Sequence, residues 1–270
     1  MKVVRSQSPD DEQKPIAGGE SRRRAGIYLL PNLFTTGALF AGFYGIVAAI
    51  NNRFEAAAIA VLVAMVLDGM DGRIARMTNT QSDFGAQYDS LSDMASFGLA
   101  PALVIYQWSL FELGKLGWLA AFMFSAAAAL RLARFNTQVG IADKRFFQGL
   151  PSPAAAGLIA ASVWFGESFG LRESLAVPGL TMLATIAAAL LMVSNIRYYS
   201  FKDLDLRGRV PFVAVLAIVM VFVLVSLEPA SVLLTLFAGY TVSGIGETWW
   251  QRRRRKAERR NARHSGDEEL

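Results

Sequence analysis

The sequence contains no cysteine, and its only histidine, His264, lies in a polar tail. Without cysteine, the chain has neither a disulfide nor a thiol nucleophile. One tail histidine also excludes a Ser-His-Asp triad, a zinc site built on histidine and a phosphohistidine intermediate. Any catalytic mechanism that depends on a thiol or an imidazole is therefore excluded.

Charged residues are scarce as well: Asp, Glu, Lys and Arg make up 18% of the 270 residues, whereas 53% are hydrophobic. This composition is typical of a polytopic membrane protein, in which each spanning helix needs about 20 mostly apolar residues. We predict an all-α integral membrane protein with about eight transmembrane helices. The predicted segments are residues 28–50, 54–76, 90–110, 116–135, 153–170, 176–195, 210–227 and 230–250.

The positive charges are distributed unevenly among the loops of this predicted topology. Only Arg53, Lys115 and Arg172 fall in loops on one side of the membrane. Positive residues stay cytoplasmic, which predicts a multi-pass protein of the inner (cytoplasmic) membrane with both termini in the cytoplasm. The net charge of +5 then reflects topology and contact with anionic membrane lipid, and nucleic acid is not an expected partner.

The polar ends of the sequence suggest a simple domain organisation. Residues 1–25 are polar and charged, which predicts a flexible cytoplasmic arm. Residues 26–251 form the predicted transmembrane domain, and residues 252–270 form a basic cytoplasmic tail. We expect one domain with two polar extensions.

Two stripes of acidic residues and glycine interrupt the apolar pattern. Asp68 and Asp71 share a helix face, and Gly85, Asp89 and Asp93 repeat every four residues. If the two stripes face each other, four carboxylates gather in a small volume and repel one another, so the cluster implies bound cations. Oxygen ligands suit Mg²⁺ or Mn²⁺, ions that commonly act on phosphates.

The segment DGMDGRIARMTNTQSDFGAQYDSLSD, residues 68–93, fills every fixed position of the pattern D-x2-D-G-x2-A-R-x8-G-x3-D-x3-D. This pattern resembles the signature of the CDP-alcohol phosphotransferase family. The segments PNLFT, RLARFN and FFQGLPSPAAAG are similar to the phosphatidylserine synthase branch of that family. The resemblance implies transfer of the phosphatidyl group from CDP-diacylglycerol to L-serine with release of CMP, at an active site on the cytoplasmic face. It also implies a homodimer.

The same resemblance implies roles for the four aspartates. Asp68, Asp71 and Asp89 would hold one Mg²⁺ or Mn²⁺ ion, and Asp68, Asp89 and Asp93 would hold a second. Asp93 would also act as the general base that takes the proton of the acceptor hydroxyl. An ordinary aspartate is a weak base for a serine hydroxyl, so metal polarisation must lower the barrier.

Other residues are expected to bind CDP-diacylglycerol, by resemblance and by residue chemistry. Arg76 suits the diphosphate, although an arginine at a membrane surface can also be an anchor. Asn32 and Ser82 have an alternative role as helix caps, and Pro31 is common at a helix start. The predicted nucleotide-lipid site comprises Pro31, Asn32, Thr35, Gly69, Gly72, Arg76, Ser82 and Gly85.

A third group, Arg131, Arg134 and Asn136, closes the fourth predicted span. The two arginines are three residues apart and share a helix face, where they can clamp the carboxylate that serine carries. Positive-inside anchoring explains either arginine alone equally well. We predict that Arg131 or Arg134 reads the serine carboxylate.

Three alternatives stay open from the sequence. Another acceptor within the family, such as glycerol 3-phosphate or inositol phosphate, would call for a denser basic pocket. A cation transporter would place its carboxylates near the bilayer midplane and would not depend on nucleotide. A noncatalytic membrane scaffold would not need all eight motif positions.

Overall fold

The computed structural model describes residues 18–78, 80, 82–138, 146–199, 212–246 and 248. Helices dominate this part of the chain. In chain order the elements are α1 (Gly18–Ile50), α2 (Phe54–Thr78), α3 (Asp83–Asp93), the π-helical turn η1 (Met94–Leu99), α4 (Ala100–Trp108), η2 (Leu110–Leu113), α5 (Lys115–Gln138), β1 (Phe146–Gln148), α6 (Ser152–Ser168), η3 (Leu171–Glu173), α7 (Val177–Val193), β2 (Arg197–Tyr199) and α8 (Phe212–Leu227). A last helix spans Pro229–Gly246.

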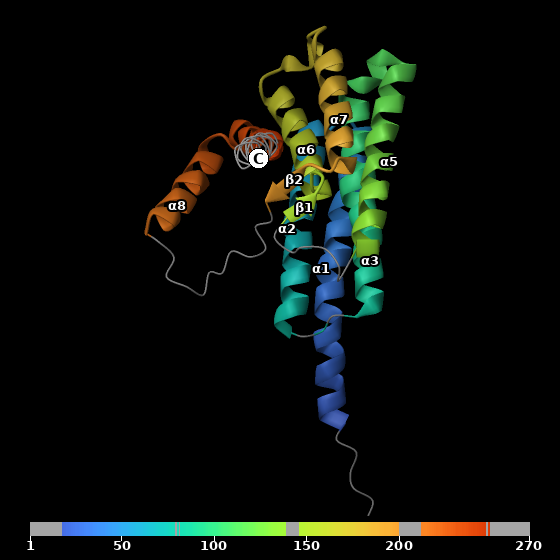
Figure 1. Ribbon diagram of the computed structural model, residues 1–270, viewed down its shortest axis with the longest axis vertical. Helices are drawn as coiled ribbons and strands as arrows, with labels where there is room; N and C mark the ends of the chain where they lie inside the picture. The colour runs from blue at the N-terminus through green and yellow to red at the C-terminus, as the bar shows by residue number, and fades with distance from the viewer. Residues whose placement is uncertain are drawn as a thin grey trace, which may run out of the picture.

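Helices α1 to α7 form an elongated bundle (Figure 1). Its long helical segments alternate in direction along the chain, with α3, η1 and α4 continuing without a break as one segment. Helix α1 packs along α2, α2 also contacts α6, and α5 lies beside α7. The turn between α1 and α2 is tight, and Asn52 adopts a left-handed φ of 57° that asparagine tolerates. Because the helices alternate in direction, the end of α2, the start of α3 and the end of α5 lie toward one end of the bundle.

Each of the eight segments expected from the sequence is helical among the described residues. The first helix begins at Gly18 instead of residue 28, so it includes part of the predicted arm. The stretches Leu30–Ile50, Lys115–Thr137 and Pro229–Gly246 are long and apolar enough to cross a bilayer, and Val177–Val193 is a shorter apolar helix. The protein is therefore a helical membrane protein. Residues 1–17 of the arm and the tail 252–270 lie outside the described residues.

The expected helical fold is confirmed, and the described residues add to it a short antiparallel ribbon of β1 and β2, in which Phe147 faces Tyr198. The strands lie in the connections before α6 and after α7, which leave the bundle side by side. Gly149, at φ 79°, turns the chain so that its N–H donates to the Ile196 carbonyl at 2.8 Å. Strand pairing satisfies backbone groups that these non-helical connections leave without helical partners. Each strand has only three residues, which is too few for an alternating apolar pattern to predict the ribbon from the sequence.

Small residues allow the bundle helices to approach closely. Ala57, Ala58 and Ala64 are fully buried on α2. On α1, a Cβ added to Gly42 would lie 2.6 Å from Ser96 Oγ and 2.8 Å from Ser96 Cα. The contact is reinforced because Ser96 Oγ donates to the Ala38 carbonyl at 3.1 Å. Small residues at helix contacts are the usual packing device of membrane helices, and here they fix α1 against the segment that carries the second acidic stripe.

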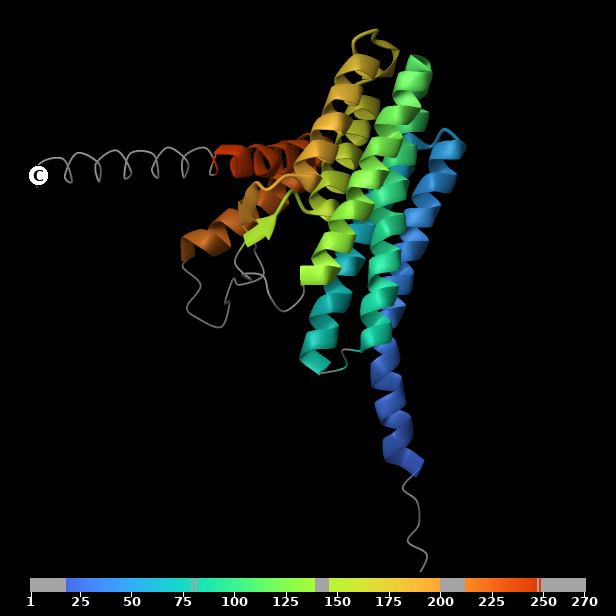
Figure 2. The same cartoon turned by 45° about the vertical axis from the view of Figure 1, so that its right-hand side comes forward.

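The last two helices are arranged differently. Figure 2 shows α8 and the helix Pro229–Gly246 projecting from the side of the bundle. Large apolar side chains of α8, such as Phe222 and Leu227, are exposed. The final helix contacts the ribbon, because the Tyr198 hydroxyl donates to the Thr241 carbonyl at 3.0 Å and the rings of Tyr198 and Tyr240 are 5.5 Å apart. These contacts join the last helix to the bundle.

Candidate active site

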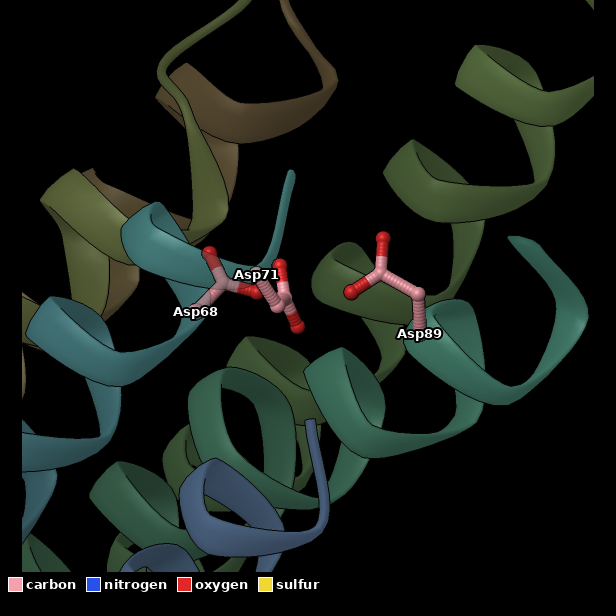
Figure 3. A group of neighbouring side chains, drawn as sticks. All are labelled: Asp68, Asp71 and Asp89. Atoms are coloured by element: carbon pink, nitrogen blue, oxygen red, sulfur yellow. The ribbon is translucent and has the colours of Figure 1, made fainter. Parts of the chain in front are cut away.

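Three carboxylates lie close together near the end of the bundle at which α2 ends and α3 begins. Asp68 and Asp71 project from α2, and Asp89 projects toward them from α3 (Figure 3). One ligand oxygen from each residue lies within 4.8 Å of the others. Asp71 is buried and its two partners are half-buried. The two acidic stripes therefore face each other, which is the condition under which the sequence implied a cation site.

Helix α1 holds this arrangement from one side. Thr35 Oγ1 donates to Asp71 Oδ2 at 2.6 Å, which fixes the orientation of the carboxylate. Ser92 Oγ, from α3, donates to the Thr35 carbonyl at 3.1 Å. One buried residue of α1 thus connects both acidic helices. This position of Thr35 beside a carboxylate was not predicted.

A cavity of about 360 Å³ opens beside the carboxylates. Its wall contains seven of the eight residues expected to bind CDP-diacylglycerol, together with two of the four predicted metal-binding aspartates. The lining residues are Pro31, Asn32, Thr35, Asp71, Gly72, Ala75, Arg76, Thr80, Ser82, Asp83, Gly85, Ala86 and Asp89. Of the predicted nucleotide-lipid residues, Gly69 is the one absent from this wall, and it is exposed.

Of Ser82 and Asn32, the two residues considered as possible helix caps, the structure shows Ser82 to be one and Asn32 not to be. Ser82 is the N-cap of α3, since its Oγ accepts from the Gly85 N–H at 3.0 Å. Asn32 is not a cap, because α1 begins at Gly18 and continues past Pro31. A Cβ on Gly85 would lie 3.1 Å from Ser82 Oγ and 3.5 Å from Asn32 Oδ1. Gly85 therefore keeps the space between α1 and the α3 cap open, and Asn32 faces that space.

Asp93 lies one helical turn beyond Asp89, at the end of α3. It interacts electrostatically with Asp68 and Asp89, and its Oδ1 atom is buried without a hydrogen-bond partner among the described residues. Four like charges near one another and a buried oxygen with no donor form an arrangement that is costly unless cations neutralise it. The donor set is entirely oxygen, so these residues fit a hard divalent cation such as Mg²⁺ or Mn²⁺.

The structure separates the two arginines that share a face of α5. Arg131 is buried, and its Nη1 donates to Ser152 Oγ of α6 at 2.8 Å. Arg131 also interacts electrostatically with Asp93. Arg134 Nη1 instead donates to the Val193 carbonyl at the end of α7, at 3.3 Å. Arg131 thus interacts with the acidic group through its charge, whereas Arg134 donates to a carbonyl at a helix end.

Asn136, at the exposed end of α5, reaches α3. Its Nδ2 donates to Ser90 Oγ at 3.0 Å, so the side chain lies next to the residue that follows Asp89. The sequence missed Ala75, Thr80, Asp83 and Ala86 as lining residues. Ala86 and Asp89 are three apart on α3, so helical spacing was a usable signal for Ala86. Thr80 lies between helices, where spacing gives no such signal.

Comparison with known proteins agrees with this geometry. The sequence profile described as CDP-alcohol phosphatidyltransferase matches residues 28–194. A Helicobacter pylori protein named CDP-diacylglycerol--serine O-phosphatidyltransferase is 37% identical over 216 residues, which are 80% of this chain and 90% of the relative.

More distant relatives carry the same name. A Methanocaldococcus jannaschii protein is 33% identical over 201 residues, 74% of this chain and 86% of its own. A Bacillus subtilis protein is 31% identical over 173 residues, 64% of this chain and 91% of its own. The matched profile covers more than half of the chain and includes both acidic stripes and the cavity wall. The chain belongs to the CDP-alcohol phosphatidyltransferase family.

Proposed function

We propose that this protein transfers the phosphatidyl group of CDP-diacylglycerol to the hydroxyl of L-serine, forming phosphatidylserine and releasing CMP. The observation that carries the proposal is the cavity whose lining combines carboxylates with Arg76, Asn32 and Gly85. Relatives that share the matched segment are named for this reaction.

The nucleotide and the diphosphate are proposed to occupy the cavity. Asn32 offers amide hydrogen-bonding groups on α1, suited to a cytosine or ribose edge. Arg76 is exposed at the cavity wall, where its guanidinium can pair with the diphosphate. Gly72 and Gly85 lack side chains, so the nucleotide can approach the helix backbone. The diacylglycerol chains stay in the bilayer while the headgroup enters from the membrane surface.

Two divalent cations, Mg²⁺ or Mn²⁺, are proposed to bind the aspartates. Asp68, Asp71 and Asp89 would hold the first, and Asp68, Asp89 and Asp93 the second. The ions, when bound, neutralise the diphosphate and stabilise the leaving CMP. The short hydrogen bond from Thr35 supports the role of Asp71, because it fixes the orientation of the carboxylate beside Asp68 and Asp89.

Asp93 is proposed to be the general base. The serine oxygen forms a bond to the phosphorus that carries diacylglycerol, and the bond between that phosphorus and the CMP oxygen breaks. The proton of the serine hydroxyl passes to Asp93, for which its buried Oδ1 without a donor is suited. Arg131, which is buried and interacts electrostatically with Asp93, is the better of the two arginines to bind the serine carboxylate.

The topology follows from the positive charges. We propose eight spans in the inner membrane with both termini and the carboxylate pocket on the cytoplasmic side. This orientation gives serine and the nucleotide direct access from the cytoplasm. The family resemblance also leads us to propose a homodimer, which chemical crosslinking in native membranes would detect.

The test is CMP release from CDP-diacylglycerol by the purified protein in detergent with Mn²⁺ or Mg²⁺. L-serine, glycerol 3-phosphate and inositol phosphate are compared as acceptors, with a chelator as control. We expect release that depends on both serine and the cation. Release with glycerol 3-phosphate or inositol phosphate but not with serine would keep the family and overturn the acceptor. No release with any acceptor would overturn the proposed reaction.

A further inference from the structure

Helix α3, which ends at Asp93, does not continue as a regular α-helix. Directly after Asp93 it widens into the π-helical turn η1, in which the Ala100 N–H donates to the carbonyl of Ala95, five residues before it. Pro101 gives a reason for the widening, because its ring has no N–H and would clash with the carbonyl four residues earlier in a regular α-helix. Such turns are rare and are frequently found at functional sites.

Two serine hydroxyls tie this part of the chain to α1, one on each side of Asp93. Ser92 directly precedes Asp93, and its Oγ donates to the Thr35 carbonyl at 3.1 Å. Ser96 lies within the π-helical turn, and its Oγ donates to the Ala38 carbonyl at 3.1 Å. Both serine side chains are buried. The backbone that carries Asp93 is therefore attached to α1 before and after this residue.

Close packing leaves the π-helical turn little room to shift. A Cβ added to Gly42 of α1 would lie 2.8 Å from Ser96 Cα, so the two helix backbones are in contact there. Toward α5, Ser125 Oγ donates to the Gly98 carbonyl at 3.1 Å. A Cβ on Gly98 would lie 3.3 Å from the Ala128 side chain of the same helix. The turn is thus held by contacts with both α1 and α5.

The same stretch of α1 fixes the first acidic stripe. The Thr35 hydroxyl donates to Asp71 Oδ2 at 2.6 Å, while the Thr35 carbonyl accepts from Ser92. The two stripes are therefore placed relative to each other through α1. Asp93 Oδ1 receives no hydrogen bond within the described part of the chain, so no neighbouring donor holds this oxygen in place. Its location is set by the backbone that carries it.

We propose that Ser96 is a positioning residue for Asp93. By tying the π-helical turn to the Ala38 carbonyl, Ser96 holds the Asp93 carboxylate where it takes the proton of the acceptor and binds the second cation. This inference rests on the proposed function and deepens it. Ser96 is fully buried between helices and is absent from the cavity wall, so it acts through Asp93 and not by contact with a substrate.

The experiment compares Ser96→Ala with Ser109→Ala in the full-length protein in detergent. Ser109 is a matched control, because its buried hydroxyl also bonds to another helix, at 2.7 Å from the Thr181 hydroxyl. Both substitutions should lower the thermal unfolding temperature. Ser96→Ala should also lower the kcat of serine-dependent CMP release about tenfold, since it removes support for a cation ligand, with the KM for CDP-diacylglycerol unchanged. Ser109→Ala should keep the kcat of the wild type.

A double variant shows whether Ser96 acts through Asp93. In the Asp93→Asn background the carboxylate that Ser96 positions is already lost, so adding Ser96→Ala should lower kcat no further. A second fall of about tenfold in this background would show that Ser96 acts independently of Asp93, which would overturn the inference.

Mn²⁺ titration followed by electron paramagnetic resonance, with CDP-diacylglycerol present, tests the position of Asp93 without turnover. The second ion should bind about tenfold more weakly to Ser96→Ala than to the wild type or Ser109→Ala. Unchanged kcat or unchanged Mn²⁺ affinity in Ser96→Ala would overturn the inference, as would equal losses in Ser109→Ala. If the wild type releases no CMP with serine, the proposed function fails, and the Mn²⁺ titration alone decides the role of Ser96.

Discussion

The polar side chains are paired at one end of the bundle, whereas at the other end like charges lie close together. At the end where α4 and α6 finish, Trp108 Nε1 donates to Glu167 Oε1 at 2.6 Å, and the Ser109 and Thr181 hydroxyls are 2.7 Å apart. At the other end, carboxylate oxygens of three aspartates lie within 4.8 Å of one another, and Asp93 Oδ1 has no hydrogen-bond partner among the described residues. One end pairs its polar groups, and the other accumulates like charges.

This difference indicates what each end contributes. Paired polar groups lower the cost of burying them and fix the helix ends, so the first end stabilises the fold. Crowded carboxylates destabilise a protein by repulsion unless something outside the chain neutralises them. The second end therefore has a role in binding that the first does not. Substitutions at the carboxylate end should therefore change activity, whereas substitutions at the end with paired polar groups should change stability.

Asp93→Asn should have the largest effect on activity. The amide keeps the shape of the side chain but cannot take the proton of the serine hydroxyl, so we expect kcat to fall by about 10²- to 10⁴-fold. Initial rates of CMP release measure the effect. The thermal unfolding temperature should not fall, because the substitution removes one repelling charge. A kcat within a few fold of the wild type would show that Asp93 is not the base.

Arg131→Gln and Arg134→Gln form a matched pair on one face of α5. Loss of the guanidinium at Arg131 should raise the serine KM by more than about tenfold, because a charged hydrogen bond to the carboxylate is lost. Arg134→Gln should leave the serine KM unchanged, because Arg134 bonds to the Val193 carbonyl and not to the acidic group. Equal increases in both variants would contradict the separation of the two arginines.

Thr35→Val should have a smaller effect. The substitution keeps the branched shape and removes the donor to Asp71 Oδ2, so the carboxylate loses its fixed orientation. We expect the Mn²⁺ concentration for half-maximal activity to rise about threefold to tenfold, by loss of a hydrogen bond that positions the ligand. Thr36→Val is the control, since the Thr36 hydroxyl contacts Tyr88 and not an aspartate. The same Mn²⁺ requirement in both variants would argue against this role of Thr35.

Glu167→Leu, at the opposite end, should change activity least. It leaves the buried Trp108 N–H without its acceptor, which costs about 1–3 kcal/mol of stability. Thermal unfolding in detergent should therefore shift to lower temperature. The kcat and the serine KM of the remaining folded protein should match the wild type. A change in serine KM would indicate that the two ends are coupled.

Local sequence patterns predicted much of this molecule. Apolar runs of suitable length located all eight helical segments, because each run must bury its side chains in the bilayer or the bundle. The spacing of Asp68 and Asp71, three residues apart, and of Gly85, Asp89 and Asp93, four residues apart, predicted two separate stripes on helix faces. Ser82 as a cap was also among the expectations and is confirmed by its bond to Gly85.

Features that depend on contacts between distant segments were not predictable in the same way. The spacing of Arg131 and Arg134 places both on one face of α5, yet their partners lie on different helices, α6 and α7. The bond of Thr35 to Asp71 likewise requires the packed bundle. The β1–β2 ribbon arises from two loops that meet only after folding.

The most direct test of the central claim is the number of Mn²⁺ ions bound per protein, measured by electron paramagnetic resonance in the presence of CDP-diacylglycerol. Asp71 is assigned to the first ion and Asp93 to the second. We predict about two ions in the wild type and about one in each of Asp71→Asn and Asp93→Asn, as the shared ligands Asp68 and Asp89 are retained. Equal Mn²⁺ binding by the wild type and both variants would contradict the role of the carboxylates as cation ligands.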